Sequence, residues 1–106
     1  MISAETINSI VRTLVEAASP TKVILFGSYP TGAARDLSDI DLLVVEPTVV
    51  SKRDEMVRLR RLLRPFRLPI DVIVVSEAEF NDWAHLVGTL FYWANTEGKL
   101  LYEASR

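Results

Sequence analysis

Three aspartates of this sequence stand beside or within apolar runs, where folding alone does not ask for a carboxylate. Asp39 and Asp41 lead into the apolar run at 42–45, and Asp71 stands near the start of the run at 70–75. Side chains alternate across a strand, so Asp39 and Asp41 point to the same face. Two like charges at close range repel by about 1 to 4 kcal/mol, depending on the effective dielectric. The usual remedy is a bound cation, and hard divalent ions such as Mg²⁺ take oxygen ligands.

A glycine–serine pair, Gly27-Ser28, supplies the complementary chemistry directly after the apolar run at 23–26. Glycine lets the backbone approach a ligand closely, and Ser28 is expected at a helix N-terminus, where free N–H groups attract phosphate. If the strand of Asp71 lies beside the strand of the other two aspartates, the three carboxylates form one acidic cluster. A phosphate cradle next to metal-binding carboxylates is the equipment of phosphoryl or nucleotidyl transfer.

These motifs resemble those of the minimal nucleotidyltransferases of the DNA polymerase β superfamily. The resemblance rests on Gly27-Ser28, on the sequence SDIDLLV at 38–44 and on the later lone Asp71, and it covers nearly the whole chain. It implies that Gly27 and Ser28 bind a nucleoside triphosphate. It also implies that three catalytic residues hold two Mg²⁺ ions, namely Asp39, Asp41 and Asp71.

The resemblance, taken together with the length of the chain, also implies a protein partner. Family members of about this length resemble antitoxins that are paired with an all-helical toxin of the HEPN ribonuclease class. The resemblance therefore implies transfer of AMP from ATP to a tyrosine hydroxyl of such a toxin, with pyrophosphate released, inside a hetero-oligomer.

Two departures from the family pattern keep other functions open. Thr31 stands where the family usually has a basic residue, and Pro30 replaces a small residue. One alternative is a non-catalytic antitoxin that neutralises its partner by occlusion. Another is a nucleotidyltransferase that modifies a small molecule such as an aminoglycoside, which would normally need a second domain or a dimer to build the acceptor site.

Composition narrows the class of protein. The chain has 106 residues, no cysteine and a formal net charge of -2, which predicts a single domain over 1–106 without disulfides or thiol chemistry. Residues 1–5 lack the basic start of a signal peptide, and no apolar run reaches membrane-spanning length. We therefore expect a cytoplasmic protein with no membrane contact. The overall charge does not favour direct nucleic-acid binding.

Basic residues gather in one segment: seven of the twelve lie between 52 and 67. A solvated helix face explains this clustering as well as a docking surface for an acidic partner, RNA or a nucleotide does.

The elements that position the candidate residues follow from apolar periodicity and from capping residues. We expect helices over 3–18 and from about 52 to 63, and a third helix after the capping box at 76–79. We expect strands over 22–26, 39–46, 70–75 and 99–103, and a short helix or turn over 28–34. The strand at 39–46 is apolar on both faces, which predicts a central place in the sheet. The expected fold is α/β (α+β), the nucleotidyltransferase fold, with a small mixed β-sheet covered by helices.

Overall fold

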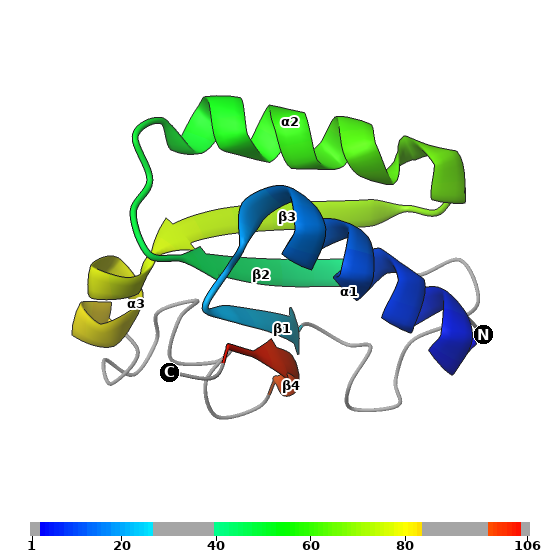
Figure 1. Cartoon of the computed structure of the whole chain (residues 1–106), viewed down its shortest axis with the longest axis horizontal. Helices are drawn as coiled ribbons and strands as arrows, with labels where there is room; N and C mark the ends of the chain where they lie inside the picture. Colours follow the sequence, from blue (N-terminus) through cyan, green and yellow to red (C-terminus); the bar gives the residue numbers. More distant parts are fainter. Residues whose placement is uncertain (1–2, 27–39, 84–97, 105–106) are drawn as a thin grey trace.

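The protein is described here by a computed structural model that covers residues 3–26, 40–83 and 98–104 (Figure 1). Its elements follow in chain order: α1 (Ala4–Ala18), β1 (Lys22–Phe26), β2 (Ile40–Glu46), α2 (Lys52–Leu63), the 3-10 turn η1 (Arg64–Phe66), β3 (Ile70–Ser76), α3 (Glu77–Trp83) and β4 (Lys99–Glu103). The bounds of these elements agree closely with those predicted from the sequence.

The four strands form one sheet in the order β3-β2-β1-β4. β2 and β3 are parallel, whereas β1 is antiparallel to both β2 and β4. The sheet is therefore mixed, as expected, and β2 occupies an inner position. β3 and β4 are the two edges of this sheet among the described strands, so no described strand lies along the outer side of β3.

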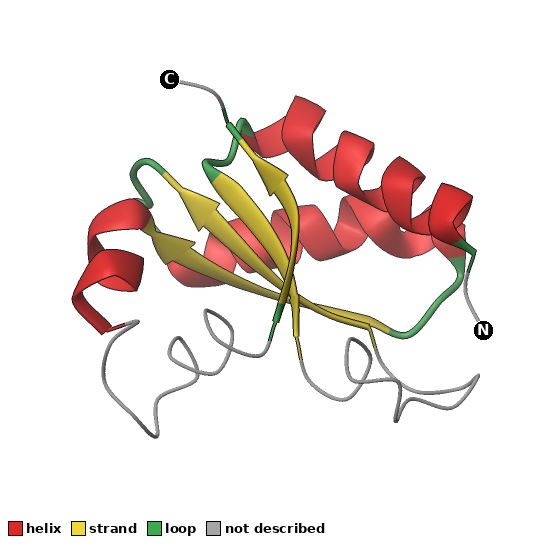
Figure 2. Ribbon diagram, turned by 90° about the horizontal axis from the view of Figure 1, so that it is seen from below, coloured by secondary structure: helices red, strands yellow, loops and turns green. Residues whose placement is uncertain are grey.

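The two long helices, α1 and α2, lie on one face of the sheet (Figure 2). Because side chains alternate along the strands, the buried residues form two clusters, one on each face. On the first face, α1 and α2 contribute buried side chains that pack on Leu25, Leu42 and Val72. On the second face, Phe80 of α3 packs against the strands. The buried residues of the first cluster are Ile10, Leu14, Val23, Leu25, Ile40, Leu42, Val44, Leu59, Leu63, Val72 and Val74. Those of the second are Ile24, Leu43, Val45, Val75 and Phe80.

Serine hydroxyls cap the starts of the helices, as the sequence predicts. The Oγ of Ser3 accepts from the backbone N–H of Thr6, and the Oγ of Ser51 accepts from the N–H of Asp54 at 3.3 Å. Ser76 does the same for Glu79 at the start of α3. The Glu79 carboxylate, however, pairs with Lys52 of α2, so this side chain ties α3 to α2.

Removing the cap of α2 should weaken the fold. A Ser51→Ala substitution leaves the N–H of Asp54 without its side-chain partner, and we expect it to lower the free energy of unfolding by about 1 kcal/mol. Urea denaturation followed by circular dichroism measures this change. Ser9→Ala, on the exposed side of α1, is the matched control and should change stability by less than about 0.5 kcal/mol. Equal effects of the two substitutions would contradict a stabilising cap.

Part of the third predicted helix lies outside the described residues. The helix expected after the capping box is present as α3, which is described as far as Trp83, and any continuation would belong to the segment 84–97. The predicted turn at 28–34 is also outside. Within the described segments, no helix is both long and apolar enough to cross a membrane.

Candidate functional site

The sheet register brings two of the three predicted aspartates together. Asp41 of β2 and Asp71 of β3 are direct partners in the parallel register. On its other side, Asp41 is paired with Phe26, the last residue of β1. The start of β2, the start of β3 and the end of β1 therefore meet at one end of the sheet (Figure 1).

The two aspartates share the second face of the sheet. Leu42 and Val72 are buried in the first cluster, so alternation turns the side chains of Asp41 and Asp71 to the opposite face. Phe26 packs on that face as well. The side chain of Asp71 is 50% exposed, and Asp41 is partly buried. The carboxylate of Asp71 is thus accessible to a ligand, and the sheet fixes the backbones of both aspartates.

Asp71 has a charged partner that the sequence did not indicate. The Nη2 of Arg60 in α2 donates to the Oδ1 of Asp71 at 2.5 Å and to the backbone oxygen of Val72 at 3.3 Å. α2 covers the first face of the sheet, whereas Asp71 points to the second. Arg60 therefore reaches around the outer edge of β3 to the candidate site.

The remaining predicted site residues, Gly27, Ser28 and Asp39, lie outside the described residues. In the chain, Gly27 follows Phe26 directly, and Asp39 precedes Ile40, the first residue of β2. In the sequence, Gly27 and Ser28 therefore follow the end of β1, and Asp39 precedes the start of β2. Both of these strand ends are part of the candidate site.

The donor set at this end suits a hard divalent cation. Asp41 and Asp71 offer carboxylate oxygens from neighbouring strands, and such oxygens are the preferred ligands of Mg²⁺. Over the described ranges 3–26, 40–83 and 98–104, no group of three or more acidic, histidine or cysteine side chains is placed to hold a metal ion. The third predicted ligand, Asp39, is outside those ranges.

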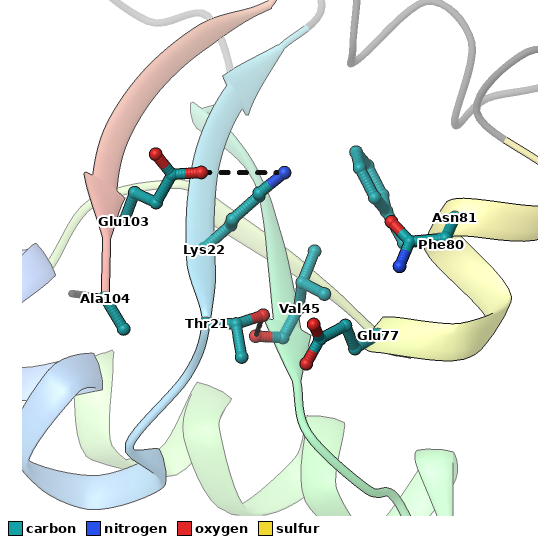
Figure 3. A pocket seen from close by; sticks show the side chains of 8 residues that line it. All are labelled: Thr21, Lys22, Val45, Glu77, Phe80, Asn81, Glu103 and Ala104. Atoms are coloured by element: carbon teal, nitrogen blue, oxygen red, sulfur yellow. Dashed lines mark hydrogen bonds and ion pairs between the residues drawn. The ribbon is translucent and has the colours of Figure 1, made fainter. Parts of the chain in front are cut away.

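A pocket of about 270 Å³ lies at the opposite end of the sheet (Figure 3). Lys22 reaches across it, with its Nζ 3.7 Å from Glu103 and 5.2 Å from the centre of the Phe80 ring. Val45 lines the pocket four residues beyond Asp41 on β2, a separation of about 13 Å along a strand. This pocket is thus distinct from the site of the aspartates.

A buried carboxyl group is the second feature that the sequence did not indicate. Glu46, at the end of β2, is only 6% exposed, and its Oε2 has no hydrogen-bond partner in the described part of the chain. Burial, and then a hydrogen bond to Glu55 and the negative charge of Glu55, raise the pKa of Glu46 to about 8. The pKa of Glu55 is lowered, chiefly because Arg58 donates to its carboxylate at 2.6 and 2.9 Å.

Several residues of the basic segment form ion pairs within the protein. Lys52 pairs with Glu79, Arg58 with Glu55, and Arg60 with Asp71. The basic segment is therefore neither a purely solvated helix face nor a purely intermolecular docking surface. Two of its side chains, Lys52 and Arg60, pair with residues of α3 and β3 and so join α2 to its neighbours.

A small mixed sheet with two long helices on one face and aspartates paired at one end has the architecture expected of a nucleotidyltransferase. The chain belongs to the nucleotidyltransferase domain family, whose model matches residues 4–97. It is accordingly a nucleotidyltransferase by family. No curated protein sequence matches the chain.

Solved structures share the fold over most of the chain. A candidate nucleotidyltransferase from Sulfolobus solfataricus aligns with a TM-score of 0.66 and 24% identity, over 93% of this chain and 78% of the other. A toxin–antitoxin complex with AMP-PNP gives a TM-score of 0.65 and 21% identity, over 92% and 73%. A variant of the toxin–antitoxin MntA-HpeT gives 0.64 and 19%, also over 92% and 73%.

Proposed function

We propose that this protein transfers AMP from ATP to a tyrosine hydroxyl of a HEPN-type toxin, in the presence of Mg²⁺, and acts as the antitoxin of that toxin. The observation that carries the proposal is the parallel register that pairs Asp41 with Asp71 at the strand end next to Phe26. Family membership supports nucleotidyl transfer as the class of reaction. The cytoplasm is the proposed location.

The proposed function assigns metal binding to the aspartates and phosphate binding to the residues after β1. Asp41 and Asp71, joined by Asp39, would hold two Mg²⁺ ions, which supply charge neutralisation for the attacking and leaving oxygens. The side chain of Asp71 is half exposed on the edge strand β3, so an acceptor hydroxyl could approach the metal site beside it. Gly27 and Ser28, which follow β1 in the chain, would bind the β- and γ-phosphates.

The comparisons support a protein acceptor. Structures with the same fold include toxin–antitoxin complexes, one of them with AMP-PNP. In a complex of that kind, the partner chain can present its own hydroxyl group to the nucleotidyltransferase site.

Intact-mass spectrometry tests the proposal. The protein and its co-purifying partner are incubated with MgCl₂ and each nucleoside triphosphate in turn. The expected result is a mass gain on the partner by whole AMP units with ATP, absent when EDTA is added, followed by fragmentation that places the group on a tyrosine. No gain with any of the four triphosphates, while the complex stays intact, would favour neutralisation by occlusion instead.

A further inference from the structure

Arg60 contacts the candidate catalytic carboxylate through one oxygen only. Its Nη2 lies 2.5 Å from the Oδ1 of Asp71, and the same nitrogen donates to the backbone oxygen of Val72. The guanidinium is thus held between a side chain and the backbone of β3. Arg60 makes no hydrogen bond to the second carboxylate oxygen of Asp71, Oδ2.

Such a contact restricts the rotation of the Asp71 side chain. Asp71 lies on an edge strand, and its side chain is half exposed, so packing alone gives its carboxylate little constraint. A charge-assisted hydrogen bond from a group that is itself anchored to the backbone supplies that constraint. Its backbone register with Asp41 is fixed by the sheet, so the orientation of the carboxylate is the remaining freedom.

We propose that Arg60 is a positioning residue that orients the Asp71 carboxylate by holding Oδ1, and so leaves Oδ2 directed to a divalent cation shared with Asp41. The inference rests on the proposed function, because it assumes that the aspartates bind a metal. Hydrogen-bond partners of ligating carboxylates typically change metal affinity or activity by about 10- to 100-fold when they are removed.

Arg60 has an opposing effect that must be weighed. Its positive charge repels a cation bound to the same carboxylate, so its removal could strengthen metal binding. Both side chains are about half exposed, at 45% for Arg60 and 50% for Asp71, and solvent and salt screen charges at such positions. The loss of orientation should therefore outweigh the loss of repulsion.

Arg60→Ala, Arg60→Lys, Asp71→Asn and Arg61→Ala test this assignment. Arg61 is the matched control, because it lies next to Arg60 on α2 and forms no ion pair with any described residue. Mn²⁺ is the probe, and electron paramagnetic resonance measures the free ion in the presence of the full-length protein and AMP-PNP. The transfer rate is measured separately as a function of Mg²⁺ concentration, with the partner as acceptor.

We expect Arg60→Ala to weaken Mn²⁺ binding about tenfold and to lower kcat by about 10- to 100-fold. Arg60→Lys, which keeps the charge on a shorter side chain without the planar guanidinium, should recover part of both losses. Arg61→Ala should bind Mn²⁺ like the wild type. Circular dichroism melts of all four variants check that the fold is intact.

Two outcomes would overturn the inference, and they are distinguishable. If Asp71→Asn loses Mn²⁺ binding while Arg60→Ala binds as tightly as the wild type or tighter, the positioning role is wrong and the proposed function stands. If the wild type itself binds no Mn²⁺ with AMP-PNP, the metal-dependent function is wrong and the role of Arg60 with it.

Discussion

Asp41→Asn and Asp71→Asn should each lower the rate of nucleotidyl transfer by at least about 10³-fold and leave the fold intact. A metal ion that stabilises the developing charge contributes several kcal/mol to catalysis, and each 1.4 kcal/mol corresponds to a factor of ten in rate. Asparagine keeps the size of the side chain but removes the negative charge that attracts the metal. Because the two residues are register partners, each substitution should be damaging on its own.

The measurement is the initial rate of AMP incorporation into the partner, followed by intact mass. Asp82→Asn is the matched control, since Asp82 is an exposed aspartate on α3 and should leave the rate within about twofold of the wild type. Asp71→Asn also loses the charge that pairs with Arg60. An exposed pair of this kind contributes at most about 1 kcal/mol to stability, so the melting temperature should change little. Transfer at the wild-type rate by Asp71→Asn would refute the assignment.

Sequence reasoning located the sheet well because its signals are local. Apolar runs bounded by glycine, proline and charged residues marked β1, β2 and β3 almost to the residue. The two-sided apolar character of β2 predicted its inner place correctly. The sequence predicted that Asp41 and Asp71 lie together only if their two strands are neighbours in the sheet. The apolar runs themselves do not reveal the order of the strands. The parallel register between β2 and β3 meets that condition.

The contact between Arg60 and Asp71 could not be predicted from local sequence signals. Eleven residues separate Arg60 from Asp71, and its role depends on how α2 is rotated on the sheet and on β3 being an edge strand. The sequence showed only that it belongs to a basic segment. Gly27, Ser28 and Asp39 were proposed from the motif, and their roles stay predictions because they lie outside the described residues.

Glu46 was identified from the sequence only as the residue that ends a strand, although one signal was available. Alternation from Leu42 and Val44 places its side chain on the first face, under α2. What the sequence could not show is the closeness of Glu55 and Arg58 at the start of that helix. Those neighbours line a pocket of about 380 Å³ with Glu46, and they determine its protonation.

The raised pKa of Glu46 predicts a stability that falls as the pH rises. In the unfolded chain this carboxyl has a pKa near 4.5, and in the folded protein it is about 8. Between these values the folded protein binds one more proton than the unfolded chain, so the free energy of unfolding decreases with pH by up to about 1.4 kcal/mol per unit. The stabilisation is complete below pH 4.5 and is lost as the pH rises through 8.

Glu46→Gln isolates this contribution, because glutamine is neutral at every pH and its amide can still donate to Glu55. We expect the variant and the wild type to be about equally stable at pH 4.5, and the variant to be about 3 kcal/mol more stable at pH 8.5. This value is below the full linkage value because water and local relaxation lower the cost of a buried charge. Asp54, Glu55 and Arg58 also line the pocket, and they are the same in both proteins.

Urea unfolding at several pH values between 4.5 and 8.5 gives the difference directly. Glu16→Gln is the matched control: Glu16 is exposed on α1, and its substitution should change the free energy of unfolding by less than about 0.5 kcal/mol. A constant difference for Glu46→Gln would mean that Glu46 is ionised in the folded protein. A difference that grows with pH would establish a neutral buried carboxyl group, held under α2 at the end of the sheet opposite the aspartates.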